Sequence, residues 1–204
     1  MGRPREFDDA AVLDAATDCF WQRGYKATSI RDLAMQMGIT GPSLYNAFGG
    51  KRALFRLILE RYVERSMRAR IQRLESSLRP KQAIRAFLAE IVERSLDDRD
   101  RRGCLLVNSA LDVAPHDREI GAEIADRLGE IETFFRRRIV AAQVEGTVPP
   151  DRDAKDTARV LLGVTLGIRV LARSKPDRQL LEGMARPALA LLNWPRRSRK
   201  TKHR

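Results

Sequence analysis

The sequence predicts an all-α protein with a small N-terminal part and a larger C-terminal helical part. Apolar residues recur three and four positions apart along most of the 204-residue chain, as they do in amphipathic helices. Alternating runs of Val, Ile and Thr, which would indicate strands, are scarce. Glycine and proline fall between the periodic segments, where they end helices. The hydrophobic content of 43% is too high for wholesale disorder and suits a chain long enough to bury a core.

Four helices are expected in the N-terminal part and its connection to the body. Asp8 or Asp9 begins the first helix, and Gly24 ends it. The second helix is capped by Thr28 or Ser29 and stops at Gly38. The fourth helix continues far past its start, because no breaker precedes the proline at position 80. The expected spans are about 9–23, 29–37, 42–48 and 51–78.

The remaining helices form the body. Their apolar stripes predict spans of about 81–96, 104–114, 117–145, 153–173 and 177–192. The chain is therefore divided into an arm and head over residues 1–50, a body over 51–192 and a basic disordered tail over 193–204, with helix 51–78 linking head to body. That long helix is expected to act as a lever, since it belongs to the head and packs into the body.

Charge and cysteine content narrow the classes of function. The formal net charge is +12, and the last twelve residues hold six Arg or Lys and no acid, so the tail favours binding to any polyanion. The two cysteines lie far apart and match no metal pattern; with no secretory signal, they indicate a reducing cytoplasm. The longest apolar run near a helix centre spans only residues 160–168, against about 20 residues needed to cross a bilayer, so no membrane role is expected.

Catalytic residues are not found. The two histidines are His116, in a turn before a helix, and His203, in the tail. A lone histidine in such a turn is more often structural than catalytic, and no phosphate-binding loop or nucleophile–base pattern accompanies it. We therefore expect no enzyme activity, no cofactor and no metal.

The segment "DLAMQMGITGPSLYNAFGGK", residues 32–51, carries the functional signal. Two short helices meet at a turn containing Gly38, and a third helix braces them, as in a helix-turn-helix. The second helix of the pair buries only Leu44 and Phe48 and fills its other face with hydroxyl and amide side chains. Such groups pair with base edges and phosphates when a helix lies in the major groove of a duplex. The alternative is a simple scaffold corner.

A longer stretch, "FWQRGYKATSIRDLAMQMGITGPSLYNAFGGKRALF", resembles the N-terminal domain of TetR-family transcriptional regulators. The matching elements are the Gly-Tyr-x-x-Thr-Ser step, "IRDLA", the Gly-Ile-Thr turn, "SLYNAF" and a Lys followed by an apolar pair. The resemblance covers about residues 7–60; the remainder agrees only in length and helix count. It implies a three-helix DNA-binding head and a larger body that dimerises and often holds a small effector.

Carried over by position, the resemblance implies roles for individual residues of the head. Thr28 would contact a phosphate, Tyr45 the DNA backbone, and Lys51 a phosphate at the start of the fourth helix. Ala47 stands where the family often has a larger residue, and Gly49-Gly50 replaces the usual polar cap of the fourth helix. The residues expected to face the major groove are Thr40, Gly41, Pro42, Ser43, Tyr45 and Asn46.

The N-terminal arm and the C-terminal helices add two further expectations. Arg3 and Arg5 flank a proline and suit a minor groove, although a solvated terminus is the alternative. The last two helices carry small and apolar residues on more than one stripe, which favours a two-fold dimer built as a four-helix bundle; intramolecular core is the alternative. The expected interface residues are Gly163, Gly167, Val170, Leu180, Met184, Ala188 and Leu191.

An effector cavity is expected between the body helices. Cys104 follows two arginines and a glycine at the start of a helix, a setting that favours the reactive thiolate and suggests redox or electrophile sensing; a small buried hydrophobe is the alternative. Aromatic residues at helical spacing are also common in an ordinary core. The residues expected to line the cavity are Phe87, Ile91, Cys104, Asn108 and Phe134, with Phe135 beside them.

These observations predict a homodimeric, sequence-specific DNA-binding transcriptional regulator. We expect a repressor whose partners are a double-stranded DNA operator, a second copy of the chain and a small-molecule effector of unknown identity that releases the operator. The alternatives are a thiol-based redox- or electrophile-sensing repressor acting through Cys104, and a non-specific architectural DNA binder that uses the charge of its tail.

Overall fold

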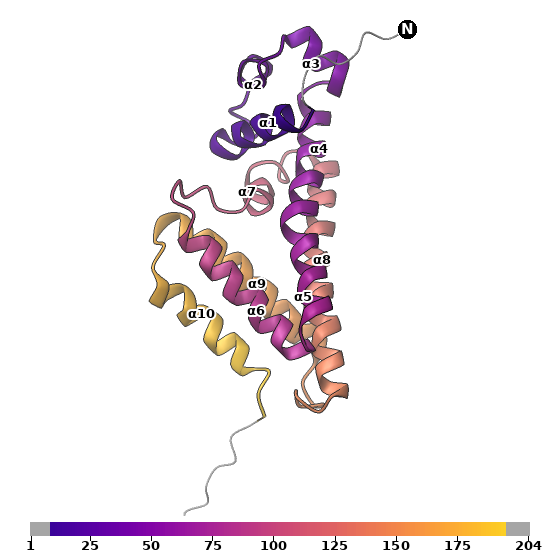
Figure 1. Cartoon of the computed structure of the whole chain (residues 1–204), viewed down its shortest axis with the longest axis vertical. Coiled ribbons are helices and arrows are strands. Elements are labelled where there is room, and N and C mark those ends of the chain that lie inside the picture. Colours follow the sequence, from indigo (N-terminus) through magenta and orange to yellow (C-terminus); the bar gives the residue numbers. More distant parts are fainter. Residues whose placement is uncertain (1–8, 195–204) are drawn as a thin grey trace, which may run out of the picture.

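The structure is a computed structural model, and it describes residues 9–194. All regular structure in this range is helical, which confirms the predicted fold class (Figure 1). Helices α1, α2 and α3 form a head at one end, and α4 and α8 run from the head along the body (Figure 1). The helices are α1 (Asp9–Arg23), α2 (Ile30–Met37), α3 (Gly41–Phe48), α4 (Lys51–Val63), η1 (Glu64–Arg68), α5 (Ala69–Ser77), α6 (Pro80–Leu96), α7 (Leu105–Asp112), α8 (Arg118–Val144), α9 (Ala154–Ser174) and α10 (Arg178–Ala190).

Aspartate side chains cap the last three body helices. Asp117, Asp153 and Asp177 each precede a helix and accept a hydrogen bond from the backbone N–H three residues later. A carboxylate at this position satisfies an amide that has no partner inside the helix and complements the positive end of the helix dipole. The starts predicted from Asp153 and Asp177 therefore lie within one residue of the observed starts.

The long helix predicted over residues 51–78 is interrupted by a wider turn. Residues Glu64–Arg68 form a π-helical turn between α4 and α5, and the helical run continues on both sides. The prediction of an unbroken α-helix is thus wrong at this point, because hydrophobic periodicity does not reveal a single inserted residue. A π turn of this kind often marks a functional region of a helix.

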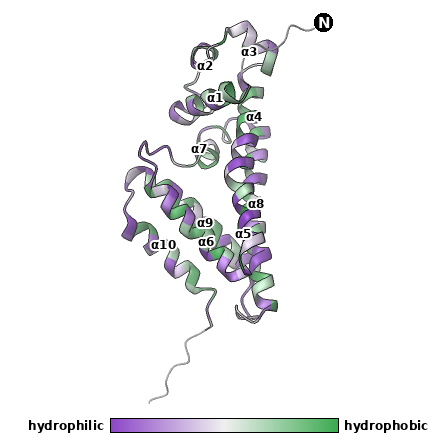
Figure 2. Cartoon of the chain, viewed as in Figure 1, coloured by the Kyte–Doolittle hydropathy of each residue, from purple (hydrophilic) through white to green (hydrophobic). Residues whose placement is uncertain are grey.

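The body buries a continuous core between its helices. Helices α8, α9, α6 and α10 pack against one another, and their hydrophobic residues alternate with hydrophilic ones at helical spacing (Figure 2). Phe87, Phe134 and Phe135 are fully enclosed, with ring centroids 5.1–5.3 Å apart. No helix within residues 9–194 has the length and apolar character that crossing a membrane requires.

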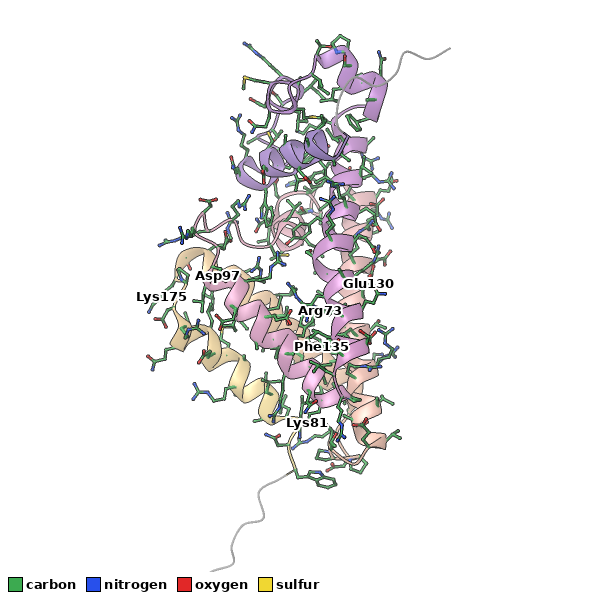
Figure 3. The ribbon with its side chains drawn as sticks, in the orientation of Figure 1. Arg73, Lys81, Asp97, Glu130, Phe135 and Lys175 are labelled. Carbon is green, nitrogen blue, oxygen red and sulfur yellow. The ribbon has the colours of Figure 1, made fainter. Side chains whose placement is uncertain are left out.

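Ion pairs connect the long helix of the head to α8. Arg52 of α4 contacts Asp117 and Glu119, with its Nε 2.8 Å from an Asp117 carboxylate oxygen. Arg68 contacts Glu130, labelled on α8 in Figure 3, at 2.7 Å. Single exposed pairs contribute little to stability, about 0–1 kcal/mol each. Their repetition along two neighbouring helices nevertheless fixes how α4 lies against α8.

Candidate DNA-binding interface

The turn between α2 and α3 has the geometry of a helix-turn-helix. Gly38 adopts a left-handed conformation with φ of 66° and ends α2, a conformation that favours glycine. Ser29 and Asp32 form a reciprocal capping box at the start of α2. Thr40 caps α3 by accepting a hydrogen bond from the Ser43 amide at 3.2 Å. Local residue types therefore define both ends of this turn.

Helix α3 divides cleanly into a buried and an exposed side. Leu44 is completely buried in the head and anchors the helix. Pro42, Tyr45 and Asn46 are exposed, and Ser43 is half-buried. The Tyr45 side chain is 56% exposed although it is large and aromatic. The face that the sequence predicts for DNA contact is thus open to solvent over the described residues.

Gly50 supports the position of the Tyr45 ring. A Cβ atom at Gly50 would lie 3.0 Å from Cε1 of Tyr45, so any larger residue would force this ring to shift. The Gly50 φ of 104° is also in a region that side chains disfavour. Gly50 therefore places the aromatic ring of α3 beside the N-terminus of α4.

Two predicted phosphate contacts are occupied by intramolecular partners. Thr28 is 1% exposed, and its hydroxyl donates a 2.6 Å hydrogen bond to the carbonyl of Gly24. Ser29, not Thr28, caps α2, so the expected role of Thr28 is not supported by its position. Lys51 places its Nζ 4.3 Å from the centre of the Tyr25 ring, and burial lowers the pKa of this amine. Lys51 must leave this ring before it can reach a phosphate.

Sequence reasoning missed one cation on the head. Arg31 of α2 is exposed and makes no hydrogen bond or ion pair with the residues that the structure describes. Arg23, by contrast, is paired with Asp32 at 2.8 Å. The sequence shows an arginine beside the capping box, but it does not show whether that side chain is paired in the fold. Two other predicted contacts, Arg3 and Arg5, lie outside the described residues.

The predicted effector residues divide between a cavity and the solid core. Phe87, Ile91 and Cys104 line a cavity of ≈ 50 Å³ between α4, α6, α7, α8 and α9. Phe134 is not among its lining residues, because its ring packs on Phe87 and Phe135 in the core. Asn108 is also absent, because its side chain bonds the Arg102 carbonyl at 2.7 Å and accepts from an arginine of α9 at 3.1 Å. The expectation for these two residues is therefore wrong.

The predicted dimer residues also differ in exposure. Val170 is 45% exposed, and a Cβ atom on Gly163 would meet nothing within 4 Å. Ala188 is 5% exposed and belongs to the core of its own protomer, so it is removed from the expected interface. Gly167 faces its own chain as well, since a Cβ there would lie 2.9 Å from Cε of Met184. Leu180 and Leu191 are half-buried.

Comparisons with known proteins agree with this geometry. Residues 12–58 match the family model of bacterial regulatory proteins of the tetR family, and residues 80–187 match the tetracyclin repressor-like C-terminal domain. An uncharacterized HTH-type transcriptional regulator, YezE of Bacillus subtilis, is 32% identical over 95% of this chain and 100% of its own length. The transcriptional repressor ComR of Escherichia coli is 30% identical over 95% of this chain and 92% of its own.

A solved structure shows the same architecture on DNA. A cysteine-substituted form of the TetR family regulator CifR, complexed with 26-base-pair operator DNA, superposes with a TM-score of 0.83 and is 33% identical, covering 95% of this chain and 100% of that one. Both halves of the present chain are thus matched, head and body together. The chain belongs to the TetR family of DNA-binding transcriptional regulators, which is a non-enzymatic family.

Proposed function

We propose that this chain is a homodimeric repressor that binds a specific operator through α3 and leaves it when a small molecule occupies the body cavity. One observation carries the proposal: Leu44 anchors α3 while Tyr45, Asn46 and Pro42 remain open to solvent. The similarity to ComR, a repressor, and to CifR, complexed with double-strand operator DNA, supports it.

Dimerisation through α9 and α10 follows from the demands of operator binding. One head contributes too few contacts for a specific site, whereas two heads reach half-sites about 34–36 Å apart. Val160 and Val170 remain 46% and 45% exposed on α9, and Gly163 between them leaves room for a second backbone. We expect sedimentation to show a dimer at micromolar concentration and Val170→Glu to shift it toward monomer. A wild-type monomer would exclude this interface.

Helix α7 connects the cavity to the head. Its first turn supplies Leu106 and Val107 to the cavity wall. At its other end, the Asp112 carboxylate accepts hydrogen bonds from the backbone amides of Tyr25 at 2.8 Å and Lys26 at 3.3 Å. A ligand that displaces α7 therefore displaces the head as well. Such a ligand releases DNA only as far as it prefers the displaced arrangement.

Footprinting on the DNA upstream of the chain's own gene tests the proposal. We expect protection of two half-sites by the full chain, and loss of protection with Tyr45→Ala, whose fold should persist because the side chain is exposed. Arg136→Gln, an exposed substitution on α8, serves as the control that keeps protection. If wild type and Tyr45→Ala bind operator and unrelated DNA with equal affinity, the protein is a non-specific binder.

A second candidate is release by modification of Cys104. Its Sγ lies in the cavity wall, 3.5 Å from the Tyr62 hydroxyl that donates to it, and neither cysteine of the chain is in a disulfide. A group added to this sulfur would occupy space in the cavity next to the start of α7. We expect iodoacetamide to alkylate Cys104 and weaken operator binding, and Cys104→Ser to abolish that sensitivity. Labelling no faster than a model thiol, with unchanged DNA binding, would exclude this route.

A further inference from the structure

Within the part of the chain that the structure describes, the cavity in the body is lined by three arginines and by no acidic side chain. Arg70 comes from α5, Arg94 from α6 and Arg169 from α9. The only other titratable groups among the described lining residues are Tyr62 and Cys104. Burial raises the pKa of the Tyr62 phenol, so this group stays neutral and supplies no negative charge. Positive charge removed from water without a partner is costly, so the arrangement needs a physical explanation.

Arg169 is buried without a carboxylate partner. Its exposed fraction is 7%. One terminal nitrogen donates to the Ser95 hydroxyl at 2.9 Å, and the other donates to the Gly103 carbonyl at 2.5 Å. Both acceptors are neutral, and no ion pair of Arg169 occurs within the described part of the chain. The two hydrogen bonds therefore fix the orientation of this guanidinium, but no carboxylate among the described residues neutralises its charge.

Arg70 is only partly compensated. It is 9% exposed, and its Nε donates to Glu90 at 3.1 Å. The same carboxylate accepts two hydrogen bonds from Arg73, which Figure 3 labels near the meeting of α5 and α6. Neither terminal nitrogen of Arg70 has a hydrogen-bond partner among residues 9–194. Burial first, and the charge of Arg94 next, lower the pKa of Arg70, yet an arginine keeps its proton at neutral pH.

The rest of the wall is apolar, and one side leads outward. Tyr62, Ser66 and Arg94 also line an outer pocket of ≈ 370 Å³ at the junction of α1 and α4. Arg94 is exposed and makes no hydrogen bond or ion pair with described residues, so it stands free at this mouth. The remaining wall consists of apolar side chains and one hydroxyl: Val63, Met67, Phe87, Ile91, Leu106, Val107, Leu128, Ile131, Leu166 and Thr165.

We propose that the effector is a small organic anion: a carboxylate on a short apolar chain, held by Arg70 and Arg169 with Arg94 at the mouth. Carboxylates match the planar donor fork of arginine, and the apolar wall takes the chain. This inference rests on the proposed function, because it names the ligand of the same cavity. The free volume of ≈ 50 Å³ holds only one or two waters, at about 30 Å³ each, so binding must move a wall. Helix α7 is one wall that also touches the head, and α4, which supplies Tyr62 and Val63, is another.

A titration with ligands matched in shape but different in charge tests the inference. Trp21 packs edge-on against Tyr62 with ring centroids 5.1 Å apart, so its fluorescence reports on the cavity. Trp194→Phe removes the other tryptophan signal. The full-length dimer in this background is titrated with butanoate, hexanoate and octanoate, each against its primary amide. We expect at least one carboxylate to bind saturably and at least tenfold more tightly than its amide.

Two variants examine the arginines separately. Arg169→Gln removes the buried charge. Arg94→Gln should leave the fold intact, because Arg94 has no hydrogen-bond or ion-pair partner to lose among residues 9–194. Each should raise the Kd of the carboxylate at least fivefold, while Arg136→Gln on the outer face of α8 should not. Equal binding of acid and amide, no saturable binding by any of the three acids, or an unchanged Kd in both variants would overturn the inference.

Operator affinity, measured without ligand on the same preparations, separates this inference from the proposed function. A protein that binds operator but none of the carboxylates refutes the anionic effector and leaves the regulator intact. A protein that binds carboxylate but no operator refutes the proposed function and leaves the anion site intact.

Discussion

Gly41→Ala separates the stability of the head from its contact with DNA. Gly41 is the first residue of α3, and a Cβ atom there would meet only Cγ2 of Ile30, at 4.0 Å, an ordinary contact. Its φ is not in the left-handed region, so alanine fits without strain. Replacing glycine by alanine at such a position stabilises a fold by about 0.4–1 kcal/mol. We therefore expect the free energy of unfolding to rise slightly or stay constant.

The same methyl group should weaken operator binding. If α3 lies in the major groove, Gly41 is where its backbone comes closest to DNA, and an extra methyl in a close contact costs about 1–3 kcal/mol. In the proposed dimer, each of the two heads would carry one such methyl. The lower limit for two heads is thus about 2 kcal/mol, which corresponds to about a 30-fold increase in operator Kd.

Fluorescence anisotropy with labelled operator, together with urea unfolding, measures both effects. Gly129→Ala is the matched control, because Gly129 lies in α8, far from the head in sequence, and a Cβ there would clash with nothing. The control should gain similar stability and leave the operator Kd unchanged. An unchanged Kd for Gly41→Ala, with the fold intact, would show that α3 does not approach DNA at its first turn.

Three further predictions concern the core, the loss of stability at low pH and the tail. Phe135→Ala, in the enclosed three-ring cluster, should lower the free energy of unfolding by about 3–5 kcal/mol in urea melts; a loss below 1 kcal/mol would contradict the packing. Arg52 lowers the pKa of Asp117 to about 2 from its ordinary 3.8, so the stability from this pair is complete above pH 4 and is lost as pH falls through 2. Asp117→Asn should flatten the wild-type decline between pH 4 and 2, and parallel curves for the two proteins would refute this origin. Deleting residues 195–204, with six Arg or Lys, should weaken binding to all DNA alike and reduce the salt slope by up to about 5, since each phosphate contact contributes about 0.9; a loss confined to operator DNA would instead give the tail a specific role.

Local signals in the sequence were sufficient to predict the helices of the head and the exposed face of α3. Gly38 predicts the end of α2, and Pro42 predicts the first turn of α3, because both depend on the conformation of a few adjacent residues. The single buried side chain Leu44 and the polar opposite face also follow from helical spacing. The solvent-exposed face of α3 was therefore predictable before any tertiary contact was known.

Several side-chain contacts were not predictable in this way. Thr28 looks like a free cap residue in the sequence, but its hydroxyl donates to the carbonyl of Gly24 within the turn between α1 and α2. Phe134 has the spacing of a cavity residue, yet its ring is enclosed by Phe87 of another helix. The π turn of residues 64–68 likewise leaves no trace in the hydrophobic pattern. Hydrophobic periodicity identifies neither the partner of a side chain nor the backbone hydrogen-bond pattern within a helix.

The sequence by itself determined the helical class, the order of the helices and the side of α3 that meets solvent, because these follow from spacing and capping within one segment. Only the tertiary structure decided that Arg70, Arg94 and Arg169 share one cavity wall while the nearby carboxylate of Glu90 is divided between two guanidinium groups. These arginines stand on three different helices, and in the sequence each reads as an ordinary solvated charge. Their convergence is set by how α5, α6 and α9 pack around the core, which no single helix encodes.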